Sequence, residues 1–257
     1  IMSTVEWQAR CDLAALYRLI AHFRMTDLID THLTLRVPGP EHHFLINRYG
    51  VLFNRMKASD LVLIDQHGKV VDSRGTDLRV NAAGFVIHSA VHMARPDLMC
   101  VIHTHTAAGI AVAAQEQGLL PISQHALKFY GKVAYHTYEG IAFSCDERER
   151  LIADLGTHKA MILRNHGLLV GGGSVAKAFH EIHFLERACQ AQIQALAGSS
   201  KLVYPTKEGY RKFNRPFWRV WRVGSGRASA ALGTDRAQIG GSCVGFRHRG
   251  AAQRLSA

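Results

Sequence analysis

The hydrophobic and polar positions along the chain predict an alternation of helices and short strands over residues 1–217. Apolar residues recur at helical spacing over residues 6–28, which predicts an amphipathic helix. Short apolar or alternating runs at 31–37, 43–47 and 61–65 predict strands. A chain in which helices and strands alternate in this way belongs to the α/β class.

The same alternation continues through the second half of this region. Helices are predicted over 83–95, 107–117 and 146–156, and strands over 99–102, 132–136 and 160–163. Glycines at 171–173, followed by Ser174, precede a long amphipathic pattern that reaches about residue 197. The glycine run lacks the Lys-Ser/Thr ending of a phosphate-binding P-loop and the Rossmann glycine spacing. We therefore interpret it as a turn and a helix start.

Three histidines stand at the ends of predicted strands. His103 and His105 follow the apolar run 99–102, and His166 follows a second apolar run within Asn-His-Gly. Side chains two residues apart on a strand point to the same face, so the first two imidazoles should lie side by side. The glycine at 167 allows the backbone to turn close to a ligand.

Two neighbouring imidazoles with a third from a distant segment are the usual composition of a divalent transition-metal site with an open position. A metal with an open position acts as a Lewis acid or activates water. Three neutral imidazoles suit zinc, the expected metal, and also suit iron, cobalt, nickel or manganese. The alternative is chance, because the chain holds 16 histidines and a His-x-His pair is a weak motif. The residues alone leave both interpretations open.

The composition is that of a domain with a substantial core. The chain has 257 residues, 47% of them hydrophobic, which is enough for one α/β domain. No apolar stretch approaches the ~20 residues of a membrane span, and the first residues lack the features of a secretory signal. The five cysteines are widely spread without any Cys-x-x-Cys. Such cysteines are typical of reduced thiols and predict a cytoplasmic protein.

The net charge of +11 is concentrated toward the end of the chain. Residues 218–257 hold seven arginines, no lysine and one acidic residue, Asp235, and so contribute +6. A nucleic-acid-binding surface should cluster on a recognisable element, so we expect no nucleic-acid partner. We divide the chain into a domain over 1–217 and a basic tail, rich in arginine, glycine and alanine, over 218–257. The tail is either poorly ordered or the product of a reading frame altered near Phe217.

Several segments carry, in order, a resemblance to a known family. They are 44–50, 58–62, 94–97 leading into His103-Thr104-His105, 120–124, 138–140, Arg164-Asn165-His166-Gly167 and 185–188. Over about residues 8–217 the chain resembles the class II aldolase/adducin head family, and within it the adducin-like branch that includes many bacterial proteins. The resemblance implies that His103, His105 and His166 bind a divalent metal.

The resemblance also implies an architecture and an activity. The expected fold is a three-layer α/β/α domain in which helices flank a central, largely antiparallel sheet. The expected assembly is a ring-like homotetramer with the site near a subunit boundary. In the aldolases of this family, zinc polarises the substrate carbonyl and stabilises an enediolate, while a glutamate acts as acid and base. The charge of the metal offsets the oxyanion that develops as the carbon–carbon bond breaks.

The chain departs from the aldolase pattern where those enzymes move a proton and hold phosphate. An ungapped alignment back from His103 places Gly84 at the position of the catalytic glutamate. Ala82 and Ala83 replace phosphate-binding serines, and Tyr49 replaces a small hydroxyl residue. Glycine cannot transfer a proton, and alanine side chains cannot donate hydrogen bonds. We therefore expect a substrate without a phosphate group, and a catalytic residue that the resemblance does not identify.

Two functions of different classes remain. The first is a metal-dependent aldol-type lyase, epimerase or dehydratase that acts on a small hydroxy-carbonyl compound through enediolate chemistry. The intact metal ligands favour it. The second is a non-catalytic adducin-type head that oligomerises and binds the cytoskeleton, with actin as the partner, and the missing glutamate favours it. We take the enzyme as the main hypothesis, because a metal triad has no evident purpose in a scaffold.

Other polar residues are weaker candidates. His88 and His92 have the i, i+4 spacing of helical metal ligands, but their apolar neighbours favour packing inside the protein. The segment 119–140 offers residues that could replace the missing base: His125, Tyr130, His136 and Tyr138. Cys100 lies in an apolar run and is expected to be a buried, inert thiol.

Overall fold

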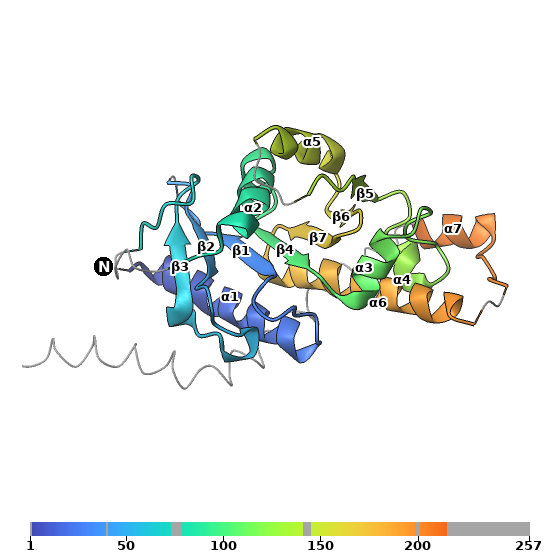
Figure 1. Cartoon of the computed structure of the whole chain (residues 1–257), viewed down its shortest axis with the longest axis horizontal. Coiled ribbons are helices and arrows are strands. Elements are labelled where there is room, and N and C mark those ends of the chain that lie inside the picture. Colours follow the sequence, from blue (N-terminus) through green and yellow to red (C-terminus); the bar gives the residue numbers. More distant parts are fainter. Residues whose placement is uncertain (1, 40, 73–78, 141–144, 199–200, 215–257) are drawn as a thin grey trace, which may run out of the picture.

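The computed structural model describes residues 2–39, 41–72, 79–140, 145–198 and 201–214. The predictions for the tail at 218–257 fall outside the described residues. Within them, one mixed sheet organises the chain, and helices cover both of its faces (Figure 1).

The sheet has seven strands in the described part of the chain, in the spatial order β3-β2-β1-β4-β7-β6-β5. The strands are β1 (His32–Arg36), β2 (Phe44–Asn47), β3 (Leu61–Ile64), β4 (Cys100–Thr104), β5 (Val133–His136), β6 (Ala160–Leu163) and β7 (Gly167–Gly172). Neighbouring strands pair antiparallel except β5 and β6, which are parallel. The expected largely antiparallel sheet is therefore confirmed.

Helices connect these strands and cover them. They are α1 (Thr4–His22), α2 (Ala82–Ala94), α3 (Ala107–Ala113), α4 (Gln124–Leu127), α5 (Cys145–Leu155), α6 (Val175–Leu196) and α7 (Lys207–Asn214), with 3-10 turns η1 (Phe53–Arg55) and η2 (Ala58–Asp60). Among the described residues, no helix is both long and apolar enough to cross a membrane.

Strand alternation divides the core between the two faces of the sheet. On β4, Ile102 belongs to the same apolar cluster as Leu16 of α1 and Ile182 of α6. Its neighbour Val101 points the other way and belongs to the cluster that contains Val91 of α2. Helices α1, α3 and α6 therefore form one layer and α2 and α5 the other, which confirms the three-layer α/β/α architecture.

A buried tyrosine fixes α1 against the strands beside the histidines. The Tyr17 hydroxyl donates to the Leu33 carbonyl at 2.6 Å and accepts the backbone N–H groups of Leu33 and Asn47 at 3.1 and 3.2 Å. Burial raises the pKa of this phenol, so the group stays protonated and can donate. The contact holds β1 and β2 at a fixed distance from α1.

Two helices end earlier than their apolar periodicity predicts. Helix α1 stops at His22 rather than 28, where Arg24 adopts a φ of 55° and the Met25 N–H bonds to the Ile20 carbonyl at 2.9 Å. This left-handed residue closes the last turn of the helix. Helix α3 ends at Ala113 rather than 117, shortly before Gly118 at a φ of 64°.

Strand β7 was missing from the sequence prediction, and the interpretation of the glycine run as a turn was wrong for its first two residues. Gly171 and Gly172 lie within β7. A Cβ atom at Gly172 would collide with the backbone of Ala178, because the first turn of α6 lies directly against the strand. Only Ser174 starts the helix, by accepting the Lys177 N–H at 3.2 Å.

Candidate metal centre

The three predicted histidines come from two paired strands. His103 lies in β4, His105 follows the end of that strand, and His166 lies in the turn between β6 and β7. The turn is tight because Asn165 adopts a φ of 55°. A Cβ atom at Gly167 would collide with the Thr104 carbonyl oxygen. The glycine therefore lets the turn approach β4 closely enough to bring His166 to the other two histidines.

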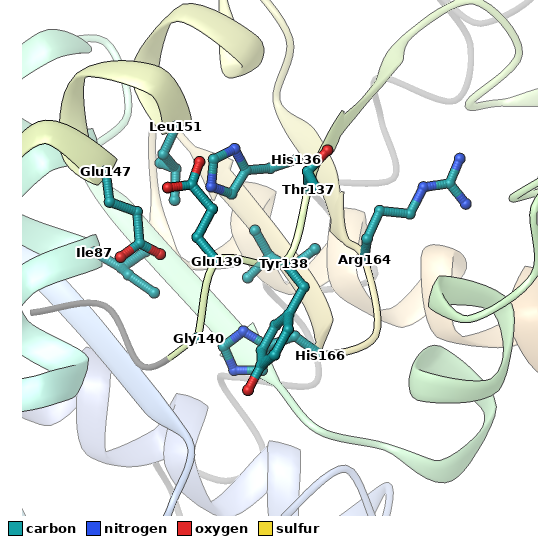
Figure 2. A pocket seen from close by; sticks show the side chains of 11 residues that line it. Ile87, His136, Thr137, Tyr138, Glu139, Gly140, Glu147, Leu151, Arg164 and His166 are labelled. Atoms are coloured by element: carbon teal, nitrogen blue, oxygen red, sulfur yellow. The ribbon is translucent and has the colours of Figure 1, made fainter.

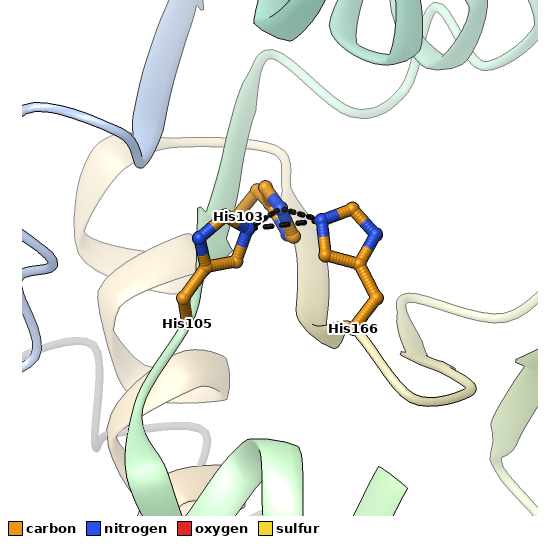
Figure 3. Close-up of side chains that lie close together, drawn as sticks. All are labelled: His103, His105 and His166. Carbon is orange, nitrogen blue, oxygen red and sulfur yellow. Dashed lines mark hydrogen bonds between the residues drawn. The ribbon is translucent and has the colours of Figure 1, made fainter. Parts of the chain in front are cut away.

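The three imidazoles converge through the same ring nitrogen (Figure 3). The Nε2 atom of His105 lies 2.7 Å from that of His103 and 2.9 Å from that of His166, and the remaining pair is 3.3 Å apart. These atoms form the group of potential metal-binding side chains found among the described residues. Three nitrogen ligands directed at one point match the protein contribution to a site with an open position.

The opposite ring nitrogens orient two of these ligands. His103 Nδ1 donates to the Leu168 carbonyl at 2.9 Å, and His105 Nδ1 donates to Asp27 Oδ2 at 3.2 Å. Because a carbonyl or carboxylate oxygen only accepts, the proton lies on Nδ1 in both rings. Nε2 of a neutral ring then carries the lone pair that a metal needs.

Burial favours the neutral form of His103 and His166. Burial, followed by the neighbouring His166 and His105, holds the pKa of His103 well below its ordinary value. Burial and then His105 lower the pKa of His166 to about 4. A neutral imidazole binds a metal without first losing a proton, so His103 and His166 are suited to bind a metal at neutral pH.

A narrow pocket adjoins His166 (Figure 2). Its polar lining comes from the end of β5 and the residues after it, from α5, and from the β6–β7 turn: His136, Thr137, Tyr138, Glu139, Glu147 and Arg164. The Tyr138 ring centroid is 6.3 Å from that of His166. Of the four residues considered as substitutes for the base, His136 and Tyr138 therefore lie beside the triad.

The other two candidates lie against different neighbours. The His125 ring packs on Phe184 of α6 at 5.1 Å, and the Tyr130 ring packs on Tyr210 of α7 at 4.9 Å. Neither residue lines the pocket. Cys100 is fully buried, and burial raises its pKa, which confirms the expected inert thiol.

The helical pair His88 and His92 is committed to hydrogen bonds inside the protein. Both rings bond to the Thr34 hydroxyl, at 2.8 and 2.7 Å, and His92 Nδ1 also bonds to the Leu98 carbonyl at 3.1 Å. Both side chains are buried. The structure thus confirms packing rather than metal binding for this pair.

Sequence reasoning missed His32, which occupies the space beside Gly84. A Cβ atom at Gly84 would collide with the His32 ring carbon Cδ2. His32 is 3% exposed and pairs with His103 in the register of β1 and β4. Burial, then His105, lowers its pKa to about 4. The α2 position that aldolases use for glutamate therefore has no room here for a carboxylate, because an imidazole from the sheet fills it.

Known proteins similar to this chain share both the sequence and the fold. The model of the Class II Aldolase and Adducin N-terminal domain matches residues 11–193. A Caulobacter vibrioides protein, provisionally named an aldolase class 2 protein, is 53% identical over 196 residues, 76% of each chain. Alpha-adducin of Rattus norvegicus is 48% identical over 191 residues, which cover 74% of this chain and 26% of adducin.

Solved structures agree with these sequence matches. An aldolase II superfamily protein from Pseudomonas syringae is 51% identical, with a TM-score of 0.84 over 92% of this chain and 95% of that one. An L-fuculose 1-phosphate aldolase from Glaciozyma antarctica is 30% identical, with a TM-score of 0.79 over 93% and 94%. The chain belongs to the class II aldolase/adducin family. Its relatives include both named aldolases and adducins, so family membership does not decide between the two functions.

Proposed function

We propose that the protein is a divalent-metal-dependent enzyme that acts on a small, unphosphorylated hydroxy-carbonyl compound. The reaction is an aldol-type lyase, epimerase or dehydratase step that passes through an enediolate. The observation that carries this proposal is the convergence of three Nε2 atoms within 3.3 Å of one another. Neutral nitrogens that crowd together gain little from one another but gain strongly from a shared cation.

His103, His105 and His166 would hold the metal, with zinc as the expected ion. When bound, a divalent metal polarises a carbonyl oxygen and stabilises the negative charge that develops on it. The Leu168 carbonyl and Asp27 fix the direction of the first two imidazoles. The pocket beside His166 would then receive the remainder of the substrate, and Ile87, Leu151 and Leu163 form its apolar wall.

The residues near Gly84 support a substrate without phosphate. Positions 82 and 83 are alanines, which offer no side-chain donors to an anion. Gly84 is packed against His32, so this segment also offers no acidic group. We further propose that the enzyme works in the cytoplasm as a homotetramer.

A second candidate function is a non-catalytic adducin-type module for oligomerisation and actin binding. Two observations favour it: the 48% identity to alpha-adducin, and the occupation of the space beside Gly84 by His32. Under this alternative the triad is a vestige, and the protein folds and assembles without any metal.

Elemental analysis of the untagged protein separates the two functions. We expect near-stoichiometric zinc or another transition metal per chain, lost in His166→Ala and retained in the control His67→Ala, whose histidine is exposed on the β3 hairpin. Folded, oligomeric protein without metal, even after incubation with excess zinc, would overturn the enzyme proposal and favour the adducin-type module.

A further inference from the structure

His136 is the polar side chain at the inner wall of the pocket beside the triad. It is the last residue of β5, and its side chain is 5% exposed. The pocket is lined by both His136 and His166, so a ligand that fills it contacts a metal-binding residue at one end and His136 at the other. Figure 2 shows His136, Tyr138 and His166 among the side chains that line this pocket.

One nitrogen of His136 is held by a carboxylate, and the other is buried without a hydrogen-bond partner among the described residues. Nδ1 donates to Asp154 Oδ2 of α5 at 2.7 Å. Because a carboxylate only accepts, the proton lies on Nδ1, and Nε2 of the neutral ring is an acceptor. Among the described residues, this buried Nε2 has no hydrogen-bond partner. Burying an acceptor without a donor is unfavourable, so the site is suited to a ligand that brings one.

The charges around the pocket indicate which donor fits. The Arg164 guanidinium bonds to the Gln115 carbonyl at 2.6 Å, and Figure 2 shows it directed away from the other lining side chains. Glu139 is paired with Arg150 at 2.8 Å. Among the described lining residues, the one arginine is therefore directed away from the pocket and bound to a backbone carbonyl. This environment disfavours a phosphate and favours a neutral hydroxyl group.

We propose that His136 Nε2 forms a hydroxyl-binding subsite that selects polyhydroxy-carbonyl substrates. Such a substrate carries at least one hydroxyl group beyond the two oxygens that face the metal, and that hydroxyl donates to Nε2. Asp154 is a positioning residue, because it sets the tautomer and the direction of the ring. The subsite rests on the proposed function, since the metal must hold the other end of the same molecule.

The test compares two probes that differ by one hydroxyl group, dihydroxyacetone and hydroxyacetone. The protein is loaded with Co(II), and the visible absorption of the metal is followed as each probe is added, which reports binding without requiring turnover. We expect the wild type to bind dihydroxyacetone about 5-fold more tightly, the effect of one net hydrogen bond. His136→Leu should bind both probes equally while it retains Co(II).

Further variants separate hydrogen bonding from packing. His136→Gln keeps a carbonyl acceptor and should restore part of the preference. Asp154→Asn alters the partner of Nδ1 from outside the pocket and should weaken the preference without loss of metal. His125→Leu makes the same His-to-Leu change away from the pocket and should leave the preference unchanged. If His136→Leu does not fold, His136→Gln and Asp154→Asn still test whether the preference depends on His136.

Each remaining outcome has a distinct meaning. If the Co(II) protein binds both probes equally, or if His136→Leu keeps the preference, the subsite is wrong and the proposed function stands. If the Co(II)-loaded wild type binds neither probe at millimolar concentration, the proposed function fails and the subsite fails with it. Tighter binding of dihydroxyacetone phosphate than of dihydroxyacetone would also overturn the inference, because the pocket would then accept the anion.

Discussion

Two groups of histidines lie on the side of the sheet that α2 covers, one on the sheet and its edge turns and one on α2 itself, and only the first is arranged to bind a metal. In the triad, the Nε2 atoms of His103, His105 and His166 point at one another. In the helical pair, His88 and His92 share the hydroxyl of a threonine on β1. Burial lowers the pKa of both helical histidines, and of His103 and His166 in the triad, and so favours the neutral form of these four rings.

The difference lies in the hydrogen bonds of each ring. In His103 and His105, partners occupy Nδ1 only and leave Nε2 free. In His92, Leu98 and Thr34 occupy both ring nitrogens. His88 also has a buried Nε2 atom without a hydrogen-bond partner in the described part of the chain. It does not belong to a group of three potential metal ligands there, whereas the triad does. The convergence of three ring nitrogens therefore distinguishes the two groups.

Removing one histidine from each group should have opposite consequences, and this is the largest expected effect. His103→Ala should reduce bound metal from about one per chain to near zero while the fold persists. His92→Ala should keep the metal but lower the free energy of unfolding by about 2 kcal/mol, because Thr34 and Leu98 lose a buried partner. Elemental analysis and denaturant unfolding measure the two quantities on the same samples. Metal retained at full occupancy in His103→Ala would refute the triad.

The helical pair should also make the metal-free protein sensitive to acid. Burial lowers the pKa of His92 to about 3, whereas the unfolded chain takes up that proton near 6.5. The unfolded state therefore binds more protons between these values. Stability from this group is fully present above pH 6.5 and falls as the pH decreases toward 3, by about 1.4 kcal/mol per pH unit.

The variant His92→Gln isolates this contribution. It should reduce the slope of unfolding free energy against pH between 6.5 and 4.5 by about 1.4 kcal/mol per pH unit. His67→Gln, at an exposed histidine, should leave that slope unchanged. An unchanged slope in His92→Gln would mean that His92 is protonated in the folded protein. The hydrogen bonds assigned to its two ring nitrogens would then be wrong, and so would the contrast with the triad.

His32 lies between the two groups of histidines. Substitution of Gly84 tests how tightly the His32 ring is packed. Gly84→Ala should place a methyl group against the His32 ring, and overpacking of this kind costs about 1–3 kcal/mol. The loss should exceed the gain of up to about 1 kcal/mol that alanine brings to a helix. Unfolding measurements should show that His32→Ala removes most of the penalty in the double variant. Gly209→Ala in α7, where a Cβ meets only ordinary contacts, is the matched control.

The sequence was sufficient for the elements that a local pattern encodes. Apolar runs located β1 to β4 and β6, and the His-x-His pair with Asn-His-Gly located the three converging side chains. The sequence pattern did not predict strand β7, because two of its residues are glycines. One of them, Gly172, allows close contact with α6. The positions of His32, Asp27 and Asp154 escaped for another reason. Each acts through a partner far away in the chain, and no periodicity records such a pairing.

The smallest expected effect comes from Asp27. Its substitution compares the side-chain partner of His105 with the backbone partner of His103. Asp27 accepts from His105 Nδ1 at 3.2 Å, whereas the partner of His103 Nδ1 is the backbone carbonyl of Leu168. Asp27→Asn keeps the shape but removes the charge that makes the imidazole a stronger ligand. Because the carboxylate is 47% exposed, we expect zinc affinity to fall by about 10-fold or less, at the low end for such partners.

Competition with a chromophoric chelator measures this affinity directly. Asp12→Asn, on α1, makes the same change in charge and serves as the control. An unchanged affinity in Asp27→Asn would mean that the geometry of the strands alone orients His105. A loss beyond about 100-fold would exceed what an orienting partner contributes. Asp27 would then do more than orient the His105 ring through Nδ1.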